Sequence, residues 1–522
     1  MLAFRVFDDA GAPAEDWPIR NAHALGSDGN AMRARIAFSA GHIVVDRRDP
    51  GPCAVALQHD LGELGSVTLQ TCLLPDRDEP YVLELELARH RLMTLLAKLE
   101  DWLLFELSHE HPVQQHADRG RELFIEALGV QKRDPAQAAA LGGEALREAF
   151  DGSEALALAH SATLLQRRAS GVSPGAPPPV GCGLSLGATD PRVRHAIKSH
   201  FDYCAIPTPW RVISPAEGQR QWGALDGWVQ WARRVNLPVV AGPVLSFEPG
   251  QAPDWLYIWE HDYDTVRDLV YEHVEALVRR LGGGVGSWVV ASGLHINEHF
   301  VLTFEQLMDL TRMVTMLVKK LQPAAKVVVE LKRCFGEYFG RNPRSIPPAM
   351  YADLLVQSGI HYDVLGLSIP MGQPVDGQYT RDLMQLSTTL DQYGQYGKPL
   401  AVSLSAPSRP VTSIMVAAPG DEPAPEDSGR WRRTWSPAVQ GHWLEAAMQI
   451  AMSKPFVESV SWREIVDHPD IELPLSGLVD EDLCPKPAWR RLVSYRQHVA
   501  ADVAAGANSA ATAPAPAPGG SA

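Results

Sequence analysis

The sequence is poor in cysteine, and its basic residues are fewer than its acidic ones. Six cysteines are scattered over 522 residues, with neither metal-ligand spacing nor a disulfide framework. We therefore expect buried free thiols in a reducing compartment. The 62 acidic residues outnumber the 47 basic ones, which gives a net charge of −15. Because nucleic acids and anionic membranes require clustered Lys and Arg, we expect neither as a partner.

Long apolar runs are also missing. No uninterrupted stretch approaches the roughly 18 residues of a membrane-spanning helix. Asp8 and Asp9 interrupt the N-terminal segment before the apolar core of a signal peptide could form, so we expect a cytoplasmic protein. The glycine-rich run at 282–286 precedes a predicted strand, which is typical of a helix-ending turn and not of a phosphate loop. We expect no cofactor and no metal.

Turn residues and composition divide the chain. Residues 1–87 hold short apolar runs bounded by Gly and Asp, which predict a small β-sandwich with carbohydrate binding as one role open to it. Residues 88–168 have helical spacing. A Pro- and Gly-rich linker follows at 169–180. Residues 504–522 consist largely of Ala, Pro, Gly and Ser and predict a disordered tail.

Residues 181–500 alternate between strand and helix patterns. Eight strand candidates separated by amphipathic helical stretches predict an α/β fold, a closed (β/α)8 TIM barrel. A doubly wound open sheet is the alternative, but it usually carries a Gly-rich phosphate turn after its first strand. The strand candidates are 183–187, 203–206, 238–247, 288–294, 326–331, 364–369, 400–405 and 457–462.

Several segments of this region resemble, in the same order along the chain, the sequence motifs of a known enzyme family. Gly286-Ser-Trp-Val-Val-Ala291 looks like the motif "WDVVNE", and Tyr362-Asp-Val-Leu-Gly366 looks like "DGIG". Gly397-Lys-Pro-Leu-Ala-Val-Ser-Leu-Ser405 looks like "GKPIxITEL", and Pro485-Lys-Pro-Ala488 ends the series as "PKPA" does. The ordered series resembles glycoside hydrolase family 10, the endo-1,4-β-xylanase family, over about residues 181–500. The resemblance implies a barrel with a saccharide cleft.

The departures from this family fall on its chemistry. Family 10 enzymes retain configuration with two glutamates, one at the end of strand four and one at the end of strand seven, and retaining glycosidases hold their carboxyl groups about 5–5.5 Å apart. The resemblance places the acid/base position on Gly293 and the nucleophile position on Ser403 or Leu404, depending on the register. None of these residues carries a carboxyl group. The resemblance therefore implies that the retaining mechanism is lost, and whether the chain is an enzyme stays open.

Other side chains near the predicted strand ends could replace the missing pair. Glu298, Glu330 and Glu464 follow strands four, five and eight, and they could form a relocated acid/base pair. Ordinary rim carboxylates paired with neighbouring Lys or Arg are the alternative. His295 could act as a general acid, or could be a hydrogen-bonded structural residue. With Glu298 it forms His-x-x-Glu, a metal pair that lacks a third ligand.

Tryptophan is concentrated in the barrel region, where twelve of fourteen fall after residue 209. Sugar rings stack on flat aromatic surfaces. Trp210, Trp288 and Trp462 lie near predicted strand ends, and Trp435 lies in an insertion. Together with Asp467 they are the candidate ligand-binding residues, although packing between helix and barrel is also open to them. The family resemblance implies that Trp462 underlies the sugar next to the cleaved bond.

Three functions therefore stay open. The first is a family 10-like barrel that binds a saccharide, or a similar small molecule, without cleaving it. The second is an active glycoside hydrolase with relocated carboxylates. The third is a non-catalytic scaffold or interaction protein, with the N-terminal module as its partner surface. The sequence leaves the oligomeric state open.

Overall fold

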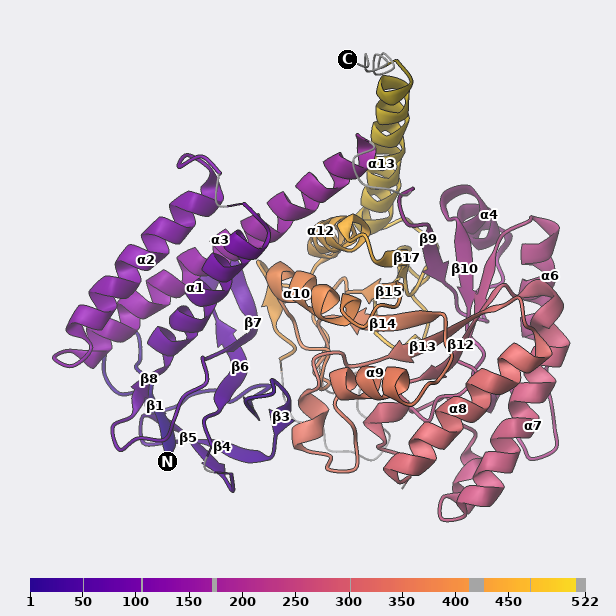
Figure 1. The fold of residues 1–522 in the computed structure, drawn as a ribbon, viewed down its shortest axis with the longest axis horizontal. Coiled ribbons are helices and arrows are strands. Elements are labelled where there is room, and N and C mark those ends of the chain that lie inside the picture. The colour runs from indigo at the N-terminus through magenta and orange to yellow at the C-terminus, as the bar shows by residue number, and fades with distance from the viewer. Residues whose placement is uncertain are drawn as a thin grey trace, which may run out of the picture.

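The computed structural model describes residues 1–49, 51–104, 107–170, 176–300, 302–412, 427–469 and 471–512. Eight parallel strands close into a barrel in the order β10-β11-β12-β13-β14-β15-β17-β9 (Figure 1). Because β9 pairs with both β10 and β17, the sheet has no edge. The predicted (β/α)8 TIM barrel is thus confirmed, and the open sheet is excluded.

Six of the eight barrel strands lie close to their predicted positions. The third, predicted at 238–247, is only Val239–Ala241. The first was predicted at 183–187, whereas β9 ends at Gly183. Gly181 lies within it, and a side chain there would collide with the Tyr203 ring, so this close approach and not strand propensity sets the position of β9. The strands are β9 (Val180–Gly183), β10 (Tyr203–Ile206), β11 (Val239–Ala241), β12 (Ser287–Ser292), β13 (Lys326–Leu331), β14 (Val364–Pro370), β15 (Leu400–Ser405) and β17 (Val457–Trp462).

Helices surround the barrel and bury its outer face. Local signals fix their starts: the Asp262 side chain accepts a hydrogen bond from the backbone N–H of Thr265, and Thr303 and Gln306 form a capping box. Trp228 and Trp443 lie fully buried between helix and barrel. The helices are α4 (Pro191–His200), α5 (Trp210–Ile213), α6 (Gly223–Arg234), α7 (Tyr263–Leu281), α8 (Phe304–Leu321), α9 (Pro348–Gln357), α10 (Leu383–Gly394), α12 (Pro437–Ser453) and α13 (Pro487–Thr512).

Two small sheets and three long helices precede the barrel and lie beside it (Figure 1). The sheets have the orders β4-β5-β1-β8 and β16-β7-β6-β2-β3. Their strands are β1 (Leu2–Arg5), β2 (His23–Leu25), β3 (Ala31–Met32), β4 (Ala34–Ser39), β5 (His42–Arg47), β6 (Ala54–Asp60), β7 (Gly65–Gln70), β8 (Tyr81–Val82) and β16 (Arg430–Trp431). The helices are α1 (Leu83–Asp101), α2 (Pro112–Val130) and α3 (Pro135–Ala169).

The insertion after β15 joins this N-terminal module to the barrel. Its strand β16 pairs antiparallel with β7 and so extends a sheet of the N-terminal module. Arg432 forms ion pairs with Asp151 and with Glu154 of α3. The Glu154 carboxylate also accepts a hydrogen bond from the indole N–H of Trp431, 2.7 Å away. These contacts attach β16 and the residue that follows it to the N-terminal module.

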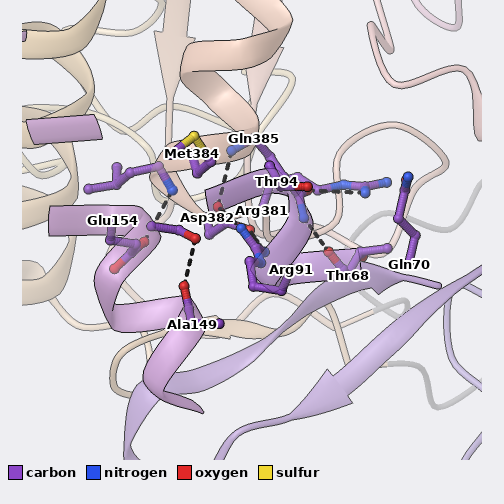
Figure 2. Close-up of polar contacts among 12 residues, drawn as sticks. Thr68, Gln70, Arg91, Thr94, Ala149, Glu154, Arg381, Asp382, Met384 and Gln385 are labelled. Atoms are coloured by element: carbon purple, nitrogen blue, oxygen red, sulfur yellow. Dashed lines mark hydrogen bonds and ion pairs between the residues drawn. The ribbon is translucent and has the colours of Figure 1, made fainter. Parts of the chain in front are cut away.

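A second contact ties α1 to the start of α10 (Figure 2). The Arg91 guanidinium donates two hydrogen bonds to the carboxylate of Asp382, at 3.1 and 2.5 Å. Both side chains are almost fully buried. The Gln385 side-chain amide donates to the backbone oxygen of Thr68 in β7, and the backbone N–H of Leu383 donates to Glu154. The module and barrel therefore share a buried polar interface.

The C-terminal helix departs from the prediction. Residues 504–512, expected as part of a disordered tail, continue α13, which ends at Thr512. The many alanines there favour a helix, which accounts for the continuation. The rest of the predicted tail, 513–522, and residues 171–175 of the predicted linker lie outside the described residues. Over the described ranges, no helix combines the length and the apolar character that crossing a membrane requires.

Candidate functional site

The mouth of the barrel, where the strands end, carries the functional side chains of barrel enzymes. Here β12 ends at Ser292, and the next residue, Gly293, has a φ of 67°. This left-handed conformation favours glycine, so a glutamate at the acid/base position would be strained. On β15, Leu404 is fully buried in the core around the barrel. Neither Ser403 nor Leu404 offers a carboxyl group to the mouth.

Glu330, at the end of β13, lies beside the acid/base position. It is in register with Ser292, whose hydroxyl donates a hydrogen bond to the Glu330 carboxylate at 2.6 Å. The Arg463 guanidinium, which follows β17, lies 3.9 Å from the other carboxylate oxygen. Arg463 also donates to the hydroxyl of Ser368 at 3.0 Å. Glu330, one of the predicted substitutes, is therefore held by a hydroxyl and a cation.

Two residues that sequence reasoning missed complete an ion network at the mouth. Glu472 accepts from Arg463 at 2.6 Å and from Lys332 at 2.9 Å, and Lys332 also contacts Glu248. Burial alone would raise the pKa of Glu472, but the two cations lower it to about 2. Glu472 is thus ionised at neutral pH. No spacing signal marks these residues, because Glu248 and Glu472 lie in loops whose course depends on the fold.

Glu298 lies in the loop after β12 and is paired with Arg333. Two guanidinium nitrogens donate to its carboxylate, at 2.6 and 3.1 Å. A bidentate pair of this kind fixes the position and orientation of the carboxylate. Glu298 is thus part of an ion pair at the rim, which was the alternative to a role in catalysis.

Glu464 differs from the other carboxyl groups. It follows β17 directly and is partly exposed, and among the described residues no hydrogen bond or ion pair holds its carboxyl group. Burial, together with the nearby charges of Glu472 and Asp467, raises its pKa to about 8 against the opposing effect of Arg463. At neutral pH its carboxyl group is therefore protonated and can donate a proton.

His295 follows β12 but is fully buried. Its Nδ1 lies 2.7 Å from the Tyr338 hydroxyl, and burial lowers its pKa to about 3, with Arg333 acting in the same direction. The imidazole is neutral and has no access to the mouth, so the general-acid prediction lacks support. The predicted metal pair of His295 and Glu298 also lacks support, because the Glu298 carboxylate is bound to Arg333. Within the described part of the chain, no three His, Cys, Asp or Glu residues cluster as a metal site would.

Two of the predicted ligand-binding tryptophans are buried in the core. Trp288 is the second residue of β12 and so lies at the opposite end of the barrel from the mouth. It is fully buried, and its N–H donates to the Gln322 side chain at 2.9 Å. Trp210 is also buried and stacks on His273, with ring centroids 4.4 Å apart. Both rings pack in the hydrophobic core. Their positions in the predicted strand pattern could not show this.

The other predicted ligand-binding residues lie near the mouth but are bound within the protein. Trp462 is fully buried, and its N–H donates to the backbone oxygen of Ser476. Trp435 is buried and donates to the backbone oxygen of Gly429. Asp467 accepts from Gly477 N–H at 2.7 Å and pairs with Lys486 at 2.5 Å. Both rings are buried, so neither presents an open face to a ligand in the described part of the chain.

No family model and no curated protein matches the chain. Among solved structures it is similar to a family 10 glycoside hydrolase from Paenibacillus barcinonensis, at 16% identity and a TM-score of 0.45, covering 63% of this chain and 97% of that one. It is also similar to xylanase B from Clostridium stercorarium F9, at 14% and 0.44, covering 63% and 98%. For xylanase 10C from Cellvibrio japonicus the values are 14% and 0.46, covering 63% and 72%. The function is inferred below from the side chains of this chain.

Proposed function

We propose that the barrel mouth binds a saccharide and does not cleave it by the retaining mechanism. The observation that carries this proposal is the pairing of the mouth carboxylates. Glu330, Glu472 and Glu248 each contact a basic side chain, while the positions at the ends of β12 and β15 have no carboxyl group. A paired carboxylate is a poor nucleophile, because its cation stabilises the charge that must attack. Fixed carboxylates and cations are instead well suited to orient sugar hydroxyls by hydrogen bonding.

Calorimetric titration of the full chain with xylo-, cello- and manno-oligosaccharides tests binding. We expect heat of binding for at least one series, and a loss of about tenfold in affinity in Arg463→Met, since one charged hydrogen-bonding group is removed. Ser39→Leu, on the exposed edge strand β4, is the matched control and should bind as the wild type does. No heat for any series would refute saccharide binding and leave the scaffold role.

Hydrolysis by relocated carboxyl groups is the second candidate, and Glu464 favours it. A protonated carboxyl group close to the ionised Glu472 is the combination of acid and base that glycoside hydrolysis uses. Release of chromophore from aryl β-glycosides tests it, with Glu464→Gln as the inactivating variant and Glu298→Gln, in a rim ion pair, as the control. A wild type that binds saccharides but releases no chromophore excludes this candidate. So does activity that survives in Glu464→Gln.

A further inference from the structure

A pocket of about 430 Å³ lies at the rim of the barrel, where the loops after β12 and β13 meet the first turns of α8 and α9. Pockets that bind small molecules usually enclose about 300–1,000 Å³, so this one has room for a small ligand. None of the residues of the ion network at the mouth lines it. The pocket is therefore distinct from the site described above.

The walls of the pocket are apolar and partly aromatic. Seven of its ten lining residues are apolar, and two of these are Phe304 and Phe339. Phe304 and Met350 remain 43% and 47% exposed, although contact with water is unfavourable for apolar side chains of this size. Among the described residues, neither phenylalanine ring pairs with another aromatic ring. An aromatic guest can therefore stack on rings that the chain itself leaves uncovered.

Arg344 is the one charged residue among those that line the pocket. Its side chain is exposed, and its guanidinium forms no ion pair or hydrogen bond with any described residue. By contrast, Arg333 and Arg341 of the same loop are paired with Glu298 and Asp376. A guanidinium without a counter-ion beside an apolar pocket is complementary to a guest that carries a carboxylate.

Hydrogen bonds to the backbone join the two loops that form the pocket. The side-chain amide of Asn297, which is buried, donates to the backbone oxygens of Leu302 and Arg344, both at 2.9 Å. The backbone N–H of Ile346 donates to the backbone oxygen of His295 at 2.8 Å. Because these bonds fix main-chain atoms on both sides, the pocket is formed before a ligand arrives, and binding requires little further ordering.

We infer that this pocket binds a small aromatic carboxylate, with its ring against the apolar walls and its carboxylate on the Arg344 guanidinium. The inference does not depend on saccharide binding at the mouth. Phe339 connects the pocket to the rest of the molecule, because it also packs against an apolar cluster formed by β2, β3 and β6 of the N-terminal module. A ligand in the pocket therefore contacts a residue at the boundary between module and barrel.

Calorimetric titration of the full chain with 3-phenylpropanoate and with its neutral amide tests the charge. We expect the wild type to bind the carboxylate, and Arg344→Gln to bind it about three- to tenfold more weakly, because a charge-assisted hydrogen bond is lost. The amide carries no charge and should bind equally to the wild type and to Arg344→Gln. Lys320→Gln, which removes the same charge from an exposed position at the far end of α8, is the matched control and should bind the carboxylate as the wild type does.

A second variant and a second ligand test the aromatic walls. Phe304→Ala removes one ring and should weaken the carboxylate and the amide alike, by about three- to tenfold. Hexanoate carries the charge without a ring and should bind more weakly than 3-phenylpropanoate. Both substituted side chains are exposed, so the variants should fold, which circular dichroism checks.

Three results would overturn the inference. One is a wild type that does not bind 3-phenylpropanoate. Another is an affinity for it that is the same in Arg344→Gln and the wild type, and a third is hexanoate binding as tight as that of the aromatic acid. Oligosaccharide titrations should be unchanged in Arg344→Gln, which keeps this test separate from that of the proposed function. A parallel loss of oligosaccharide affinity would make the pocket part of the saccharide site and would also count against the inference.

Discussion

Glu464 offers a prediction that depends on one carboxyl group. Its pKa is raised from an ordinary value of 4.5 to about 8, with burial as the main cause. Glutamine has nearly the shape of a protonated glutamate and does not ionise. Replacing Glu464 by glutamine should therefore change stability only at those pH values where ionisation of the glutamate matters.

The sign follows from proton binding. Between pH 4.5 and about 8 the folded protein keeps a proton on Glu464 that the unfolded chain has released, so stability falls as pH rises through this window. The pKa difference is about 3.5, and each pKa unit corresponds to about 1.36 kcal/mol, so the loss is at most about 4–5 kcal/mol once pH exceeds 8. Partial exposure of the Glu464 side chain reduces this loss, and Glu464→Gln avoids it. The variant should match the wild type below pH 4.5 and exceed it by up to about 4–5 kcal/mol at pH 9.

Urea denaturation followed by tryptophan fluorescence, at intervals from pH 4 to pH 9, measures the difference between the two proteins. The variant Glu298→Gln is the control, because the carboxyl group that it removes belongs to a rim ion pair with Arg333. A difference between Glu464→Gln and the wild type that does not grow with pH would refute the reasoning. It would show that Glu464 is ionised like an exposed carboxylate, and the proton donor of the second candidate function would be lost.

Four other variants test the packing and charges described above. Arg91→Met leaves the buried Asp382 without its cation and should lower the free energy of unfolding by about 3–5 kcal/mol. Adding Asp382→Asn in the same chain should recover part of this loss. Urea midpoints measure both changes. Trp462→Ala should cost about 3–5 kcal/mol in the same assay, because the ring is fully buried; a loss of ligand affinity at unchanged stability would contradict this. The pKa of Glu472 is lowered to about 2, so its stabilising effect is complete above pH 4.5 and is lost as pH falls toward 2; acid titration by circular dichroism should show Glu472→Gln lacking this transition.

The barrel could be predicted because its signals are local. Apolar runs of strand length alternate with amphipathic helical segments, and each strand and helix depends mainly on its own residues. The position of β9 could not be predicted, since it depends on Tyr203 packing over Gly181 from the neighbouring strand. Strand β16 was also missed, because two residues in an insertion become a strand only by pairing with β7.

The candidate site was predicted less well, for a related reason. Positions at strand ends could be counted, which placed Gly293 and Glu330 at the mouth. Which side chain faces the barrel axis, and which charged group pairs with it, depends on loops that follow other strands. Glu472 reaches Lys332 and Arg463 only through such a loop. The burial of the tryptophans could not be predicted, because a position near a strand end does not show whether the side chain faces the barrel axis or the helices.

The charges of the mouth bear on which ligand the proposed function could accept. Lys332 and Arg463 are paired with the carboxylates of Glu248, Glu330 and Glu472, two cations against three carboxylates. Among the described residues, this network therefore holds no unpaired cation that would attract an anion. If the mouth binds a saccharide as proposed, this balance of charge favours a neutral ligand over an anionic one.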